Sequence, residues 1–93
     1  MRIAEVIGTV TLSRCHPAAQ GYRWLIGVPY SLKALRANAA PDGEDLVILD
    51  ELGAGQGQKI GVSEGVEASM PFYPNKKPLE AYCACILDVV NVE

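Results

Sequence analysis

Charged, aromatic and histidine residues are all scarce in this chain. Of its 93 residues, 20% are charged and 6% are aromatic, with a single His, Trp and Phe. No run approaches the about 18 uninterrupted apolar residues of a membrane-spanning helix, so we expect no membrane partner. The net charge is −3, from 8 basic and 11 acidic residues. A nucleic-acid module usually carries a basic excess, so we expect no nucleic-acid partner.

Three cysteines make an odd number, and the chain opens without a signal peptide. Both features argue against a disulfide framework and predict a reduced, cytosolic protein. Hydrophobic residues make up 49% of the chain, which excludes a disordered protein. The length predicts one domain over residues 1–93, with a core that is thin for the number of apolar residues present.

Short segments of alternating polar and apolar residues predict five strands, at 3–13, 22–30, 46–50, 59–63 and 81–90. Residues 31–43 are interpreted as a loop with room for one helical turn, capped by Ser31. Gly8, inside the first strand, predicts a bulge or a sharp bend. Five short strands in a chain of this size can hide their edges by closing. The predicted fold is therefore all-β, a five-stranded small barrel of the oligonucleotide-binding (OB) type.

The alternation also predicts which side chains share a face. In the first strand it groups Ala4 and Val6 with Gly8 and Val10, and in the last strand it places Cys83 and Cys85 together. Trp24 lies on an alternating strand, where a core position is the common outcome.

The cluster Gly53-Ala54-Gly55-Gln56-Gly57 is the most distinctive local motif. Glycine-rich loops cradle phosphates where a helix N-terminus follows. Here a strand-like segment follows, and the Gly-Lys-Ser/Thr ending of a phosphate-binding loop is missing. The motif therefore does not predict a phosphate site. A tight hairpin with positive φ, or a surface that another backbone approaches closely, explains the glycines better. Asp50 and Glu51, just before the cluster, are interpreted as solvated or interface acids.

No other residue group builds a catalytic or metal site. Cys15-His16 pairs a nucleophile with a base only in sequence, and two loop residues are the simpler interpretation. Cys83 and Cys85 lack further ligands nearby and are interpreted as small buried hydrophobes. We predict no catalytic residues, no metal and no cofactor. The alternative function is an OB-fold module that binds single-stranded nucleic acid through aromatic and basic side chains.

Several segments, in order, resemble the EutN/CcmL vertex proteins of bacterial microcompartments. They are MRIAEVIGTV at residues 1–10, Gln20-Gly21 leading to Trp24-Leu25-Ile26, Asp50-Glu51-Leu52-Gly53-Ala54-Gly55-Gln56-Gly57, Ser63-Glu64-Gly65, Pro78-Leu79-Glu80-Ala81 and Ile86-Leu87-Asp88. The resemblance covers nearly the whole chain. One departure is the stretch Gly65-Val66-Glu67-Ala68-Ser69, where the family usually has an Arg.

The resemblance implies a structural shell protein without enzymatic activity, located in the microcompartment shell of the bacterial cytoplasm. It implies an OB-like barrel that assembles as a homopentamer and caps fivefold vertices, beside hexameric and trimeric shell proteins. The glycine loop is then expected at a subunit interface or near the fivefold axis. This candidate site comprises Asp50, Glu51, Gly53, Ala54, Gly55, Gln56 and Gly57.

Overall fold

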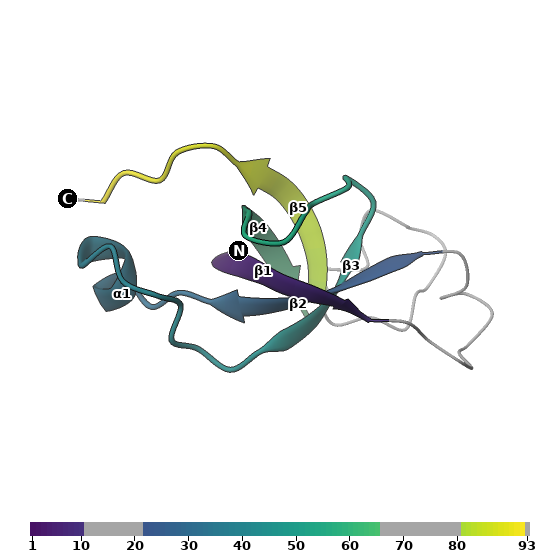
Figure 1. Cartoon of the computed structure of the whole chain (residues 1–93), viewed down its shortest axis with the longest axis horizontal. Coiled ribbons are helices and arrows are strands. Elements are labelled where there is room, and N and C mark those ends of the chain that lie inside the picture. Colours follow the sequence, from purple (N-terminus) through teal and green to yellow (C-terminus); the bar gives the residue numbers. More distant parts are fainter. Residues whose placement is uncertain (11–21, 66–80, 93) are drawn as a thin grey trace.

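The computed structural model of the chain describes residues 1–10, 22–65 and 81–92. It contains β1 (Arg2–Val10), β2 (Arg23–Pro29), α1 (Leu32–Arg36), β3 (Leu46–Asp50), β4 (Lys59–Glu64) and β5 (Ala81–Leu87). The strands form a closed barrel in the order β1-β2-β3-β5-β4 (Figure 1). The all-β barrel predicted from the alternation is confirmed.

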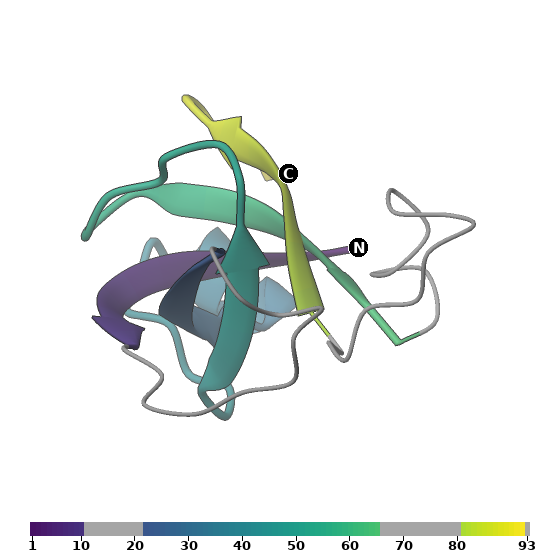
Figure 2. The ribbon, with the colours of Figure 1, turned by 90° about the vertical axis from the view of Figure 1, so that its right-hand side faces the viewer.

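Each strand of the barrel pairs with two neighbours. The pairs β1–β2, β2–β3, β1–β4 and β4–β5 are antiparallel. The pair β3–β5 is parallel and closes the sheet, with Leu49 opposite Tyr82. Figure 2, turned by 90°, shows the strands wrapped around one axis. Closure gives every described strand two neighbours, which leaves less strand edge for pairing with another chain than an open sheet would.

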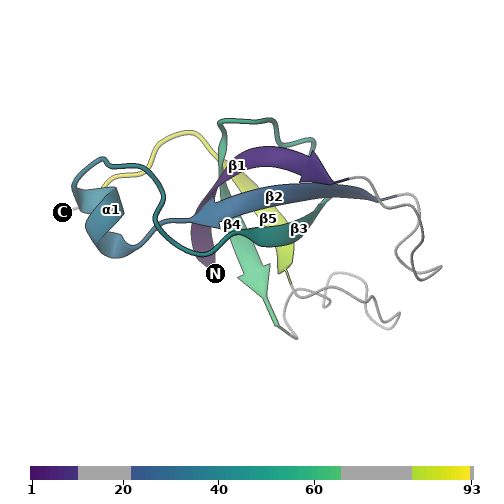
Figure 3. The same ribbon diagram turned by 60° about the horizontal axis from the view of Figure 1, so that its bottom comes forward.

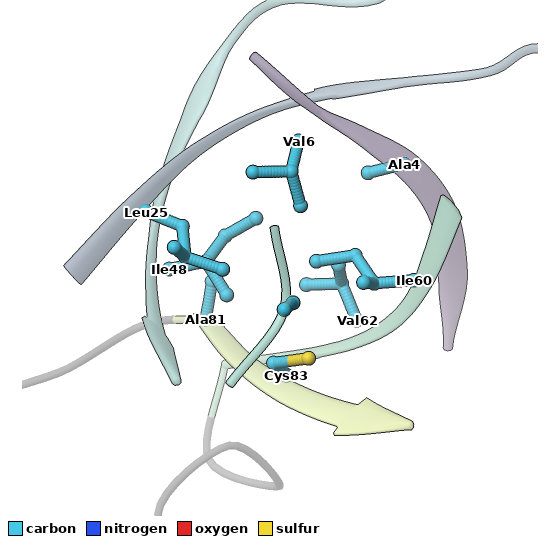
Figure 4. Packing of buried hydrophobic residues seen from close by; sticks show 9 residues of the cluster. Ala4, Val6, Leu25, Ile48, Ile60, Val62, Ala81 and Cys83 are labelled. Carbon is cyan, nitrogen blue, oxygen red and sulfur yellow. The ribbon is translucent and has the colours of Figure 1, made fainter. Parts of the chain in front are cut away.

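The core lies inside the barrel and receives side chains from all five strands (Figure 4). Leu25, Ile48, Ile60 and Val62 are fully buried there. The smaller members of the cluster are Ala4, Val6, Ala54, Ala81 and Cys83. Small residues on β1 and β5 suit a narrow barrel, because bulky side chains from five strands would collide at its centre.

A bulge in β1 reverses the alternation of its faces. The register against β2 shifts between Val6 and Gly8, with Ile7 as the extra residue. Beyond the bulge Thr9 lies opposite the core residue Leu25. Gly8 and Val10 therefore point away from the core. The predicted bulge is confirmed, but the prediction of one shared face is wrong past Ile7.

A second bulge, in β5, also reverses which residues face the core. Cys83 lies opposite Val62 and Cys85 opposite Gly61, which leaves Ala84 as the extra residue. Cys83 is fully buried in the core, whereas Cys85 is half-buried on the other face. The prediction that the two thiols share a face is wrong, because a bulge moves later residues to the opposite side.

Trp24 is buried but does not belong to the barrel core. It forms a second cluster with Leu49 on the outer face of β2 and β3. Val10, Tyr22 and Tyr82 pack against this cluster. The predicted burial of Trp24 is confirmed, with the ring outside the barrel instead of inside it.

Residues 31–43 contain one helical turn, as predicted. The Ser31 hydroxyl accepts a hydrogen bond from the Ala34 N–H and caps α1. Figures 1 and 3 show α1 and the C-terminal segment at the same end of the barrel. The last strand ends at Leu87 and not at residue 90, because Leu87 already pairs with Lys59, the first residue of β4. The predicted strand residues 11–13 lie outside the described residues.

The glycine loop as candidate functional site

Asp50 and Arg23 anchor the glycine loop to the barrel. Asp50 ends β3 on the same face as the core residue Ile48, and Arg23 lies directly opposite it on β2. Asp50 is 2% exposed, and its Oδ2 lies 2.9 Å from Arg23 Nη1. Of the two interpretations, a solvated or an interface acid, the first is wrong for Asp50, and the second stays a prediction. A carboxylate can stay buried here because a guanidinium neutralises it and hydrogen bonds satisfy its oxygens.

The backbone of the loop supplies those hydrogen bonds. Asp50 Oδ1 accepts from the Leu52 N–H at 2.9 Å, while Oδ2 accepts from Gly53 at 3.1 Å and Ala54 at 3.0 Å. Arg23 Nη1 also donates to the Ala54 carbonyl oxygen. One carboxylate and one guanidinium thus hold residues 51–54 in a fixed turn.

Beyond this turn the loop crosses the end of the barrel. Ala54 is fully buried and belongs to the core cluster. Gln58 Oε1 accepts from the Gly55 N–H at 2.6 Å. The backbone of Val6 makes two hydrogen bonds to the loop. Its carbonyl oxygen accepts from the Gly57 N–H at 2.8 Å, and its N–H donates to the Gln58 carbonyl oxygen at 2.9 Å. These contacts tie the loop to β1 as well as to β3.

The loop is not a hairpin, because β3 and β4 are not neighbours in the barrel. It links two strands that are separated by β5, so the hairpin prediction is wrong. The predicted positive φ is confirmed at Gly53 (83°) and Gly57 (88°), a region that favours glycine. Gly55 does not have a positive φ. A Cβ at Gly55 would lie 3.6 Å from Gln58 Oε1, an ordinary contact.

The outward side of the loop carries Glu51, Leu52 and Gln56, all exposed. Glu51 Oε1 accepts a hydrogen bond from the Tyr82 hydroxyl at 3.0 Å. Burial, followed by this bond to Glu51, raises the pKa of Tyr82. Leu52 is 49% exposed. The loop therefore offers a rigid backbone with one unpacked apolar side chain, which suits contact with another protein better than chemistry.

The remaining candidates behave as structural groups where the structure describes them. Burial foremost, then the charge of Asp50, raises the pKa of Cys83 to about 12, so its thiol stays protonated. Within residues 1–10, 22–65 and 81–92, no three His, Cys, Asp or Glu side chains gather as metal ligands, and no helix is long and apolar enough to cross a membrane. Cys15 and His16 lie outside the described residues.

Two of the aromatic side chains that a nucleic-acid binder would need are buried. Trp24 is 8% exposed and Tyr30 is 9% exposed. The Tyr30 hydroxyl donates to Glu5 Oε1 at 2.7 Å, and burial together with this carboxylate raises the pKa of Tyr30 to about 12. Neither ring can stack on a base without leaving its packing.

The sequence and the fold of this chain both match known proteins over nearly all of its residues. Residues 1–88 match the family model described as "Ethanolamine utilisation protein EutN/carboxysome". The chain is 34% identical to the carboxysome shell vertex protein CcmL of Synechococcus elongatus, over 100% of this chain and 89% of that protein.

Two solved structures are similar over the whole chain. One is a GrpN pentameric microcompartment shell protein from Rhodospirillum rubrum, with a TM-score of 0.83, 28% identity and 100% of both chains covered. The other is CcmL of Gloeobacter violaceus, with a TM-score of 0.85, 28% identity, and 100% of this chain and 91% of that one covered. On this agreement of sequence and fold, the chain belongs to the EutN/CcmL family.

Proposed function

We propose that this chain is a structural protein that assembles as a closed homopentamer and caps the fivefold vertices of a bacterial microcompartment. Its neighbours there are the hexameric and trimeric proteins of the shell, and it performs no catalysis of its own. The observation that carries the proposal is the end-to-end match to a pentameric shell protein, with both chains fully covered. A sheet of hexagons cannot close without fivefold units, so a pentamer with matching edges supplies the missing curvature.

We further propose that the glycine loop, with Asp50, Glu51, Gly53, Ala54, Gly55, Gln56 and Gly57, lies at a subunit interface or near the fivefold axis. Two observations support this placement. The loop is held rigidly by Asp50 and Arg23, and it nevertheless leaves Leu52 half-exposed. A ring interface needs two different faces on each subunit, and a rigid loop with an unpacked apolar side chain suits one of them.

Native mass spectrometry tests the assembly. A chain of 10.0 kDa predicts one dominant species of about 50 kDa at micromolar concentration. A Leu52→Ser variant tests the placement of the loop, because Leu52 contributes little to the fold of one chain. We expect this variant to stay folded and to populate smaller species. A wild-type chain that remains monomeric or dimeric contradicts the pentamer, and a fully pentameric Leu52→Ser variant contradicts the placement of the loop.

A further inference from the structure

Two sulfur atoms meet over Gly61, on the outer side of β4. Gly61 lies between the core residues Ile60 and Val62, so its own face points away from the barrel core. A Cβ built on Gly61 would lie 2.6 Å from Cys85 Sγ and 3.0 Å from Met1 Sδ. The two sulfur atoms therefore face one point in space, which is empty because residue 61 has no side chain.

The bulge in β5 brings Cys85 to this place. The extra residue Ala84 turns the strand, so that Cys83 points into the core while Cys85 lies opposite Gly61 on the outer side. The φ of Gly61 is not positive, so the backbone does not require a glycine there. Glycine weakens a strand interior, and here it provides the space that the two sulfur atoms share.

The chemistry of the pair suits a soft metal ion. A thiolate and a thioether are ligands that select soft ions such as Cu(I), whereas structural zinc takes four ligands. A bond from an ion to sulfur is about 2.3 Å long, so one ion in linear coordination joins two sulfur atoms about 4.6 Å apart. Met1 is 77% exposed, and its flexible side chain can adjust to that separation. Cys85 is half-buried, so solvent reaches it more easily than it reaches the fully buried Cys83.

We propose that Cys85 Sγ and Met1 Sδ bind one soft monovalent metal ion, such as Cu(I), in the space above Gly61. On binding, the Cys85 thiol releases its proton to the solvent and its thiolate bonds to the ion. The thioether of Met1 donates a lone pair and stays neutral. One positive ion and one thiolate leave the site without net charge. This site is separate from the glycine loop, and it does not depend on the proposed pentamer.

Titration with Ag(I), which has the same charge and ligand preference as Cu(I), tests the site by native mass spectrometry. The parent chain carries Cys15→Ser and Met70→Leu, which removes the cysteine and the methionine outside the described residues. We expect one Ag(I) per parent chain. Cys85→Ser removes a ligand, and Gly61→Ala fills the space between the two, so both should weaken binding at least tenfold. Gly8→Ala is the matched control, because its Cβ meets no heavy atom within 4 Å, and it should bind like the parent.

A second measurement shows whether Met1 is a ligand. In the parent chain Met1 is the remaining methionine, so NMR of a chain labelled with ¹³C at the methionine methyl group reports on it alone. Ag(I) should shift this signal in the parent and leave it in place in Cys85→Ser. A signal that does not move in the parent means that a single thiol holds the ion, and it overturns the inference. Binding by Cys85→Ser as tight as that of the parent overturns it as well. If circular dichroism shows that Gly61→Ala is unfolded, the Met1 signal and Cys85→Ser decide.

Discussion

At the scale of single residues, Asp50 links the barrel to the loop. Its burial could not be predicted from the sequence, because two adjacent acids before a glycine cluster are usually exposed. A sequence signal for this burial was present on β2, the strand that pairs with the end of β3. Arg23 shares its alternation face with Leu25, so it occupies the inward side of β2 at the barrel end. A cation at an inward position calls for a buried acid opposite it.

Replacing Asp50 with Asn should therefore destabilise the folded chain. An amide keeps only one acceptor oxygen, so the group facing either Leu52 or the Gly53–Ala54 turn would be an N–H donor. The Arg23 guanidinium would also lose its counter-charge. We expect the free energy of unfolding to fall by about 1–3 kcal/mol, measured by urea denaturation. Glu51→Gln, at an exposed position, is the control. Equal stability of the two variants would contradict the role assigned to Asp50.

The glycines of the loop should differ in their tolerance of substitution. Gly57→Ala forces a side chain into the left-handed region and should cost about 1 kcal/mol. Gly55→Ala adds a methyl group in ordinary contact with Gln58 and should change the stability by less than about 0.5 kcal/mol. Thermal unfolding of both variants checks this. An equal cost at both positions would show that crowding, and not φ, governs the loop.

At the scale of elements, the alternation located every strand and the two bulges limited what else it could predict. The third strand is 46–50 in both prediction and structure, and the second and fourth are within one residue at each end. Face assignment failed past Ile7 and past Ala84, because each bulge inserts one residue while the sequence keeps its period of two. Gly8 and the apolar Ile7 signalled the first bulge. Nothing comparable marks Ala84, which resembles its neighbours.

The connection that carries α1 depends on a shared set of hydrogen bonds. Asp42 accepts from both the N–H and the hydroxyl of Ser31, and that hydroxyl also caps α1. The Ser31 hydroxyl is the main reason that the pKa of Asp42 is lowered. Because the folded pKa lies below the unfolded one, this interaction stabilises the fold above the unfolded pKa. Its contribution is lost as the pH falls through the folded pKa.

Ser31→Ala should remove the cap and return the pKa of Asp42 toward its ordinary value. We expect a loss of about 1 kcal/mol near neutral pH from the cap. NMR titration of the Asp42 carboxyl carbon should show the pKa rising in the variant. Ser31→Thr, which keeps a hydroxyl, should restore both readouts. An unchanged Asp42 titration in Ser31→Ala would contradict this account of the connection.

At the scale of the whole molecule, the closed barrel gives each described strand two neighbours, so faces and loops are the main surfaces available for assembly. The glycine loop is one such surface, and it keeps the apolar side chain of Leu52 half-exposed in the single chain. The composition of this loop was visible in the sequence, but its placement required the strand order of the barrel. The alternation predicted the barrel and the family resemblance predicted the vertex role, whereas the buried Asp50–Arg23 pair was found in the structure.

The most direct test of the vertex role is electron microscopy of shells assembled by co-expressing hexameric shell proteins with and without this chain. With the chain present, we expect closed polyhedral particles. Without it, the hexamers should form tubes, open polyhedra or particles that lack their corners, since fivefold units are missing. An equal fraction of closed particles in both preparations would contradict the claim that this chain seals the vertices.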